Sequence, residues 1–493
     1  MSEEILINVT PQETRVAVVE NGVLQEVHIE RTSSRGLVGN LYKGTVVRIL
    51  PGMQAAFVDA SLERTAFLHA SDIIQEGQSE DNGNGHESGE ETKSIDQLLR
   101  EGQDIIVQVV KDPISTKGAR LTTQIAIPAR NLVYLPYSNN IGVSQRIEDA
   151  QEREQLRTTV RRAMGDQIEG GYIVRTMAET VSLDEFKSDI LFLNRTWAKI
   201  REQIKNSPAK SLVHEDLSLA MRFMRDLVGG RVEKVRIDSR ETFQKAQKFA
   251  EELIPEVKDR IEYYPGERPI FDLHSVEDEI QKALEKKVML KSGGFLIIDQ
   301  TEAMTTVDVN TGGFVGRRNL EETLYKTNLE AAQTIARQLR LRNIGGIIII
   351  DFIDMQEVEH QRQVMRALEK ALAHDHVKTS VTTMSPLGLV EVTRKRSRES
   401  LERVLCGTCP ICSGRGVLKS PQTVCYEIFR DILRESRQFD AKEYQVVASQ
   451  WVVDLLLDEE SESLVKLQEF IGRPIHLQVE SQYHQEEFDI VLM

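Results

Sequence analysis

The sequence predicts a protein built from several α+β domains. Its 493 residues exceed what one hydrophobic core usually organises, so two to four domains are expected. Strand patterns and helical patterns alternate along the whole chain, which favours mixed domains over an all-α or all-β fold. The contents of 40% hydrophobic and 28% charged residues are those of an ordinary globular chain.

Composition also excludes several classes of protein. No run approaches the roughly 20 apolar residues that cross a bilayer, and the start MSEEILINVT lacks the features of a signal peptide. All four cysteines lie between Cys406 and Cys425, which is no distributed disulfide framework, so we expect a soluble, cytoplasmic protein. The net charge of −15 argues only weakly against a nucleic-acid partner, because local basic patches decide binding.

The N-terminal part predicts strands and a small barrel. VAVVENGVLQEVHIE alternates around Asn21 and Gly22, a pair favoured in two-residue hairpin turns. Residues 39–125 carry short strands and tight turns. The acidic, glycine-rich stretch 75–96 reads as a flexible surface insertion.

Two phenylalanines in this region are candidates for contacting unpaired bases. Phe57 and Phe67 lie on neighbouring predicted strands, where aromatic rings can form a stacking platform worth about 1–3 kcal/mol per base. Lys43 and Lys117 could supply phosphate contacts. The alternative is that both phenylalanines belong to the barrel core, and periodicity alone leaves the two interpretations open.

A second cluster of polar residues follows two strand patterns later in the chain. TTVDVN places Asp308 and Asn310 on one face of an extended strand. IIIIDF is an apolar run typical of a strand buried on both faces, and it ends in Asp351. Apolar residues at helical spacing between the strands predict an amphipathic helix: Leu320, Leu324, Ala331, Ile335 and Leu339.

This pattern brings Asp308 and Asp351 toward the ends of neighbouring strands. Two carboxylates with the amide oxygen of Asn310 suit Mg²⁺ or Mn²⁺. Such an ion polarises a phosphoryl oxygen and helps to generate hydroxide, so phosphodiester hydrolysis needs no protein nucleophile. The alternative is that each aspartate is a helix cap or an ion-pair partner.

Two further segments could bind phosphate. GGYIVRT places Arg175 and Thr176 at a strand end, where a guanidinium and a hydroxyl could hold phosphate oxygens, although a plain surface pair is the common alternative. EVTRKRSRES would bring Arg394, Arg396 and Arg398 onto one face if it were extended, with a solvated strand as the alternative.

The cysteines predict a zinc site. Cys409 and Cys412 lie in a knuckle, CPICSGRG, whose glycines suit a tight turn better than the helix start of a redox motif. A structural Zn²⁺ needs four ligands. Cys406 and Cys425 could complete a site within one chain, or two chains could each contribute Cys409 and Cys412.

Several of these segments resemble the RNase E/G family. YKGTVVRI, AAFVDA, AFLHASDI and GQDIIVQVVKD are similar to its OB-fold RNA-binding domain. SGGFLIIDQTEAMTTVDVNTG, NLEAAQTIARQLRLRNIGGIIIIDFIDM and GLVEVTRKR are similar to its catalytic core, and the likeness runs over essentially the whole chain.

The resemblance implies a particular domain order. The expected parts are an RNase H-like subdomain (1–38 and 216–283), the OB-fold domain (39–125), a 5′-sensor domain (126–215), a DNase I-like α/β catalytic domain (284–405), a zinc link (406–416) and a small C-terminal α+β domain (417–493).

It also implies an activity and its residues. We expect a Mg²⁺-dependent endoribonuclease that cuts AU-rich single-stranded RNA and leaves 5′-phosphate and 3′-hydroxyl ends. Asp308 and Asp351 would bind Mg²⁺, Asn310 would position the phosphate, and Arg175 with Thr176 would sense a 5′-monophosphate. Phe57, Phe67 and Lys117 would touch RNA.

The resemblance further favours a homodimer, or a higher oligomer, in which Cys409 and Cys412 of two chains share one Zn²⁺. Ribosomal RNA precursors and mRNA are the expected substrates. The rival functions are a non-catalytic RNA-binding adaptor, which would not need the aspartates, and a deoxyribonuclease or phosphodiesterase that uses the same metal chemistry.

Overall fold

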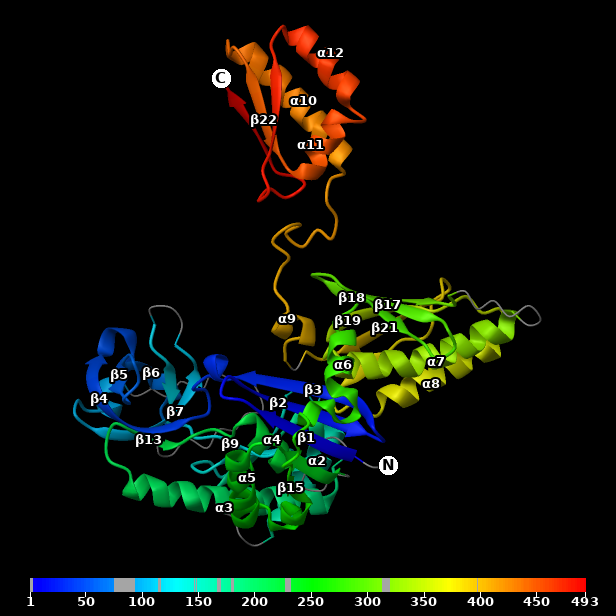
Figure 1. Cartoon of the computed structure of the whole chain (residues 1–493). Coiled ribbons are helices and arrows are strands. Elements are labelled where there is room, and N and C mark those ends of the chain that lie inside the picture. Colours follow the sequence, from blue (N-terminus) through cyan, green and yellow to red (C-terminus); the bar gives the residue numbers. More distant parts are fainter. Residues whose placement is uncertain are drawn as a thin grey trace. The chain divides into compact units, whose positions relative to one another are not determined.

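The computed structural model forms two compact units, Met1–Val404 and Leu405–Met493 (Figure 1). It describes residues 3–74, 94–113, 117–145, 147, 149–165, 170–178, 181–226, 232–312, 320–396 and 398–493. Most of the predicted acidic insertion at 75–96 lies outside the described residues. Within the described parts, no helix is both long and apolar enough to cross a bilayer.

The first sheet combines strands that are far apart in the sequence. Its order is β15-β14-β1-β2-β3, and β14 lies parallel to β1. The predicted hairpin is confirmed, since Asn21 and Gly22 turn with φ of 50° and 79°. The strands are β1 (Glu3–Val9), β2 (Glu13–Glu20), β3 (Val23–Arg31), β14 (Val232–Ile237) and β15 (Ile261–Tyr263); nearby helices are α4 (Leu219–Asp226), α5 (Arg240–Leu253) and α6 (Val276–Lys282).

The predicted small barrel follows β3. Five strands run β4-β5-β6-β8-β7, and pairing of β7 with β4 closes the ring. Alternate residues such as Ala56, Val58 and Leu68 fill its core. The elements are β4 (Leu41–Leu50), β5 (Ala55–Asp59), β6 (Ala66–His69), α1 (Ile95–Leu98), β7 (Asp104–Lys111) and β8 (Arg120–Thr122), with β13 (Ser211–His214) added beside β4.

A mixed region between the barrel and β14 shares one hydrophobic core with the first sheet. Its four strands run β11-β12-β10-β9. The elements are β9 (Ile127–Pro128), β10 (Leu132–Leu135), β11 (Ile141–Val143), α2 (Ala150–Met164), β12 (Gly171–Val174) and α3 (Leu183–Asn206). The first sheet is therefore assembled around two inserted regions.

A six-stranded sheet in the order β16-β17-β18-β19-β21-β20 follows. The predicted helix is confirmed as α7, on which Ala331, Ile335 and Leu339 are fully buried. The elements are β16 (Lys287–Met289), β17 (Phe295–Gln300), β18 (Met304–Asn310), α7 (Leu320–Leu341), β19 (Gly346–Asp351), α8 (Val358–Leu372), β20 (Thr379–Val381), β21 (Leu389–Arg394) and α9 (Leu401–Leu405).

In the part of the chain that the structure describes, helices cover one face of this sheet and leave the other open. α7 and α8 pack together on the covered face and share a core with Val307, Ile348 and Ile350. On the other face, Ile347 is 49% exposed. The expectation that IIIIDF is buried on both faces is therefore wrong, because the helices that follow β18 and β19 both return on the same side.

The second unit is a small α+β domain with its own core. Its three strands run β23-β22-β24. The elements are α10 (Pro421–Gln438), β22 (Tyr444–Ala448), α11 (Gln450–Leu457), α12 (Ser461–Ile471), β23 (Ile475–Val479) and β24 (Phe488–Leu492). A mixed α+β, multidomain architecture is thus confirmed, while the domain boundaries and the fold-family names stay predictions.

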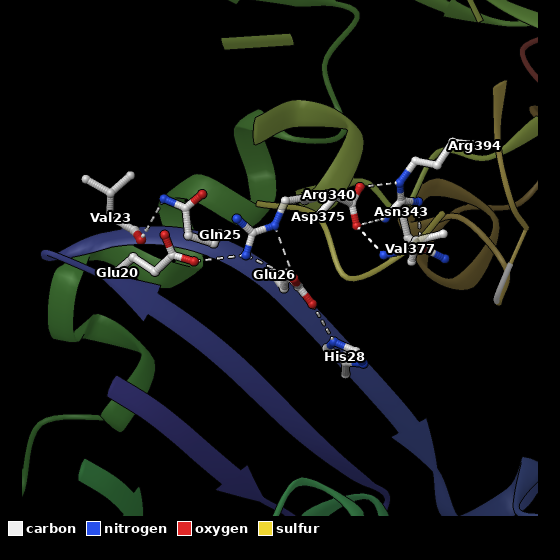
Figure 2. A network of polar contacts seen from close by, with 10 residues as sticks. All are labelled: Glu20, Val23, Gln25, Glu26, His28, Arg340, Asn343, Asp375, Val377 and Arg394. Carbon is white, nitrogen blue, oxygen red and sulfur yellow. Dashed lines mark hydrogen bonds and ion pairs between the residues drawn. The ribbon is translucent and has the colours of Figure 1, made fainter. Parts of the chain in front are cut away.

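A buried arginine joins α7 to the β2–β3 hairpin (Figure 2). Arg340 donates to Glu20 Oε1 at 2.9 Å and to Glu26 Oε1 at 3.1 Å, and its side chain is 6% exposed. Glu26 also contacts His28 Nε2 at 3.2 Å. Burial acts to raise the pKa of Glu26, but the hydrogen bond with His28 and the charge of Arg340 hold that pKa well below its usual range.

A second buried pair corrects the interpretation of the basic segment. Arg394 Nε donates to Asp375 Oδ2 at 2.6 Å, and both side chains are at most 3% exposed. Arg394 also donates to Asn343 Oδ1 at 3.2 Å (Figure 2). It is therefore unavailable to RNA, and β21 ends at this residue, so Arg394, Arg396 and Arg398 do not form one extended basic face.

We expect Asp375→Ala to lower the free energy of unfolding by about 3–5 kcal/mol, because the buried guanidinium of Arg394 would lose its counter-charge. Urea unfolding followed by circular dichroism measures the change. Glu359→Ala is the control: Glu359 lies in an exposed pair with Arg362 at 3.8 Å, and its loss should cost less than about 0.5 kcal/mol. A cost below about 1 kcal/mol for Asp375→Ala would contradict the assignment.

Candidate active site

Asp308 and Asp351 lie side by side on the open face of the six-stranded sheet. β18 and β19 are parallel, and their register pairs these two residues directly. Neighbouring strands are about 4.8 Å apart, so the two carboxylates project from adjacent backbone positions. Val307 and Val309 point into the core, which leaves Asp308 exposed between them.

Asn310 completes the group. It lies two residues beyond Asp308, on the same face of β18, and its Nδ2 donates to Asp308 Oδ2 at 2.9 Å. That hydrogen bond fixes the amide plane, and among the described residues nothing else bonds the second N–H or the amide oxygen. The structure therefore brings together the three residues that the sequence selected.

The electrostatics of the pair favour a cation. Partial burial raises the pKa of Asp351, and the negative charges of Asp308 and Asp354 raise it further. A divalent ion would remove this repulsion. Within the described residues, no group of three or more His, Cys, Asp and Glu side chains is gathered for metal binding. Mg²⁺ typically takes one or two carboxylates, with water and phosphate oxygens as its other ligands, so the donor set fits.

The two phenylalanines of the barrel lie outside its core. Phe57 and Phe67 are opposite each other on β5 and β6, with ring centroids 6.2 Å apart, and both are half-buried. Lys117 is exposed, while Lys43 Nζ donates to the carbonyl of Ser207 at 3.0 Å.

Strand register adds two cations that the sequence analysis missed. Arg48 is paired with Phe57, and Arg120 is paired with Phe67. The result is a row of arginine, two aromatic rings and arginine across the barrel, in which the guanidinium of Arg120 also pairs with Asp72 at 2.8 Å. Aromatic rings next to cations are a combination suited to single-stranded nucleic acid. No signal in one strand could have revealed this row, because it depends on pairing between strands.

Arg175 and Thr176 follow β12 in the mixed region, and both are half-buried. Arg175 Nη1 donates to the carbonyl of Ala129 at 2.8 Å, and its backbone N–H donates to Asn131 O at 2.9 Å. Burial lowers the pKa of Arg175, and the nearby charge of Arg225 lowers it further.

Asp189 on α3 binds the turn before β10 that Arg175 also contacts, and the sequence analysis did not select it. Its Oδ2 accepts the N–H groups of Asn131 at 2.7 Å and Leu132 at 3.2 Å. Burial raises the pKa of Asp189 to about 6, although these hydrogen bonds oppose the rise. The sequence signal that could have identified Asp189 is its position on the apolar face of a helix.

The cysteines divide into a knuckle and a core residue. The backbone N–H of Gly416 donates to Cys412 Sγ at 3.4 Å, and this bond, with others from Gly414 and Cys409, lowers the pKa of Cys412. Cys425 is fully buried on α10, and burial raises the pKa of its thiol to about 11. Because its thiol is part of the hydrophobic core, Cys425 is less suited than the exposed Cys406 to join Cys409 and Cys412 in a zinc site. Cys406 is exposed.

The chain combines a closed barrel with a separate sheet that carries paired aspartates, so it is a multidomain α+β protein with an acidic, all-oxygen candidate site. The model of the Ribonuclease E/G family matches residues 126–397, and that of the RNase E/G thioredoxin-like domain matches residues 408–492. The chain therefore belongs to the ribonuclease E/G family, as the resemblance predicted.

Individual relatives extend the similarity over the full length. The chain is 53% identical to ribonuclease G of Salmonella typhimurium and of Escherichia coli K12, and both alignments cover each protein completely. It is 35% identical to ribonuclease E of E. coli K12, over 93% of this chain and 43% of that protein.

We expect Asp189→Asn to change the pH dependence of stability. A carboxyl whose pKa is about 6 in the folded state and near 4 in the unfolded state loses stabilisation as the pH rises through that window, by up to about 3 kcal/mol. An amide cannot ionise, so the unfolding free energy of the wild type minus that of the variant should fall between about pH 4 and pH 6. Urea unfolding at several pH values measures this difference. A difference that stays constant between pH 4 and pH 6 would contradict the raised pKa of Asp189.

Proposed function

We propose that this protein is a Mg²⁺-dependent endoribonuclease that cuts single-stranded RNA at the Asp308–Asp351 pair. Membership of the ribonuclease E/G family makes the chain an endoribonuclease of RNA processing. The observation that carries the metal-dependent mechanism is the direct pairing of the two aspartates on an open sheet face.

Each residue of the site has a distinct role in this proposal. Asp308 and Asp351 would hold the ion, which supplies charge stabilisation and a more acidic water when it is bound. Asn310 is oriented by its bond to Asp308, and its second N–H can donate to a phosphate oxygen of the scissile linkage. The expected products carry a 5′-phosphate and a 3′-hydroxyl.

The barrel and the Arg175 loop would select the substrate. Phe57 and Phe67, with Lys117 and the flanking arginines, would hold unpaired bases and their phosphates. Arg175 and Thr176 would bind a 5′-monophosphate, and a triphosphate would fit poorly in a half-buried site. Preference for AU-rich RNA, and roles in maturation of ribosomal RNA and decay of mRNA, are part of this proposal.

Zinc would be shared between two chains. Cys409 and Cys412 provide two thiol ligands, and the N–H donors around Cys412 favour its thiolate, as a zinc ligand requires. With Cys425 in the core, a second chain is the proposed source of the remaining two ligands, which gives a homodimer. All four thiols are free, in keeping with the proposed cytoplasmic location.

The first test is cleavage of a short, unstructured AU-rich RNA with a 5′-monophosphate or a 5′-triphosphate, with Mg²⁺ or EDTA. We expect internal cleavage that needs Mg²⁺ and favours the monophosphate. Asp308→Asn and Asp351→Asn should each lower the rate at least about a hundredfold, because several kcal/mol of charge stabilisation are lost.

Asp299→Asn is the matched control for these variants. Asp299 lies on the neighbouring strand β17 and pairs with Lys286 at 2.6 Å, so its loss should leave the rate within about twofold. RNA binding without cleavage under every condition would overturn the enzymatic mechanism and support an RNA-binding adaptor instead.

Metal content tests the zinc proposal. We expect about half a Zn²⁺ per chain, loss of that zinc and of the dimer in Cys409→Ser, and unchanged zinc in Cys425→Ala, because the Cys425 thiol lies in the core. Mass spectrometry of the metal and sedimentation measure the two quantities. One Zn²⁺ per chain in a monomer would instead indicate a closed site that includes Cys406.

A further inference from the structure

A pocket of about 460 Å³ lies between the end of β3 and the segment that leads from β21 into α9. It is separate from the aspartate pair, the barrel and the Arg175 loop. Its polar lining consists mainly of three arginines and two serines, with one carboxylate: Arg31, Ser33, Ser34, Arg398, Arg403 and Glu399.

Hydrogen bonds fix both walls of this pocket. On one side, Asn343 Nδ2 donates to the carbonyls of Arg398 at 3.0 Å and Glu399 at 3.1 Å. On the other, the N–H of Thr32 donates to Gln12 O at 2.8 Å, and Ser34 Oγ donates to Arg31 O at 3.2 Å. The pocket is therefore held in shape by backbone contacts that leave the arginine side chains free to bind.

The arginines of the pocket are only partly balanced by carboxylates of the protein. Within the described part of the chain, the guanidinium groups of Arg398 and Arg403 make no hydrogen bond or ion pair. Burial lowers the pKa of Arg398 to about 10, and the charge of Arg394 acts in the same direction while that of Glu26 opposes it. Arg31 Nε is 3.9 Å from Glu13 Oε2, too far for a hydrogen bond.

Such a site is complementary to an anion. A partly desolvated guanidinium without a partner is costly, so binding an anion would be favourable. The planar fork of arginine matches two oxygens of a phosphate, and the hydroxyl of Ser33 can donate to another. Glu399 is the one lining group that would oppose the anion.

We propose that this pocket binds a phosphate group, and that this phosphate belongs mainly to the backbone of bound RNA. The assignment to RNA rests on the proposed function, whereas the assignment to phosphate rests on the pocket alone. A contact there would add affinity without reading sequence, because phosphates are common to all RNA.

Binding of a fluorescent single-stranded RNA, measured by anisotropy over a series of salt concentrations, tests the RNA source. All proteins carry Asp308→Asn, so that cleavage does not interfere. Arg398→Met and Arg403→Gln should each weaken binding about fivefold and reduce the salt slope by about 0.7. Arg366→Gln is the matched control, because Arg366 is exposed on α8 and is not in the pocket lining.

Thermal stabilisation by inorganic phosphate tests whether the pocket binds a free phosphate compound instead. If RNA binding is unchanged, but phosphate raises the melting temperature of the parent and not of Arg398→Met or Arg403→Gln, the pocket binds a free phosphate compound. If neither measurement distinguishes these variants from Arg366→Gln, the pocket proposal is overturned. A parent that does not bind RNA would refute the proposed function, and the phosphate measurement would still decide the pocket.

Arg403 is exposed, so its variant should fold even where Arg398→Met does not, and circular dichroism checks both.

Discussion

The parallel pairing of β18 with β19 is the constraint on which the candidate active site depends. Two parallel neighbours need a crossover connection, and α7 lies in that crossover on one face of the sheet. α8 returns on the same face, so the other face stays open. Because the register places Asp308 beside Asp351, two like charges meet there, and the raised pKa of Asp351 reflects that proximity as well as burial. A cation resolves the repulsion, which links the topology directly to metal chemistry.

The same crossover helix also attaches the six-stranded sheet to the first sheet. Arg340, near the end of α7, reaches Glu20 and Glu26 on the β2–β3 hairpin, and burial of its guanidinium makes this contact sensitive to loss of either partner. The arginine-rich pocket lies at the same junction, between β3 and the segment that precedes α9. A feature of this kind can exist only where two regions that are distant in the sequence meet.

Several expectations failed for one common reason, which is that a single segment does not specify what packs against it. The run IIIIDF looks fully buried, yet Ile347 is 49% exposed because no helix covers that side. Arg394 looks like a surface cation, yet Asp375, from a loop before β20, binds it in the interior. Cys425 looks like a fourth thiol near a zinc knuckle, yet it faces inward from α10 into a hydrophobic core.

The sequence by itself determined the hairpin at Asn21–Gly22, the helix α7, the small barrel and the three residues Asp308, Asn310 and Asp351. These features follow from local rules: turn chemistry, the periods of helix and strand, and short spacings along one element. Only the tertiary structure decided that Arg48 and Arg120 flank the aromatic pair, that Asp189 accepts the N–H groups of Asn131 and Leu132, and that Arg398 lines a pocket. Those relations depend on strand register and on packing between distant segments, because side chains far apart in the chain meet only after the backbone has folded.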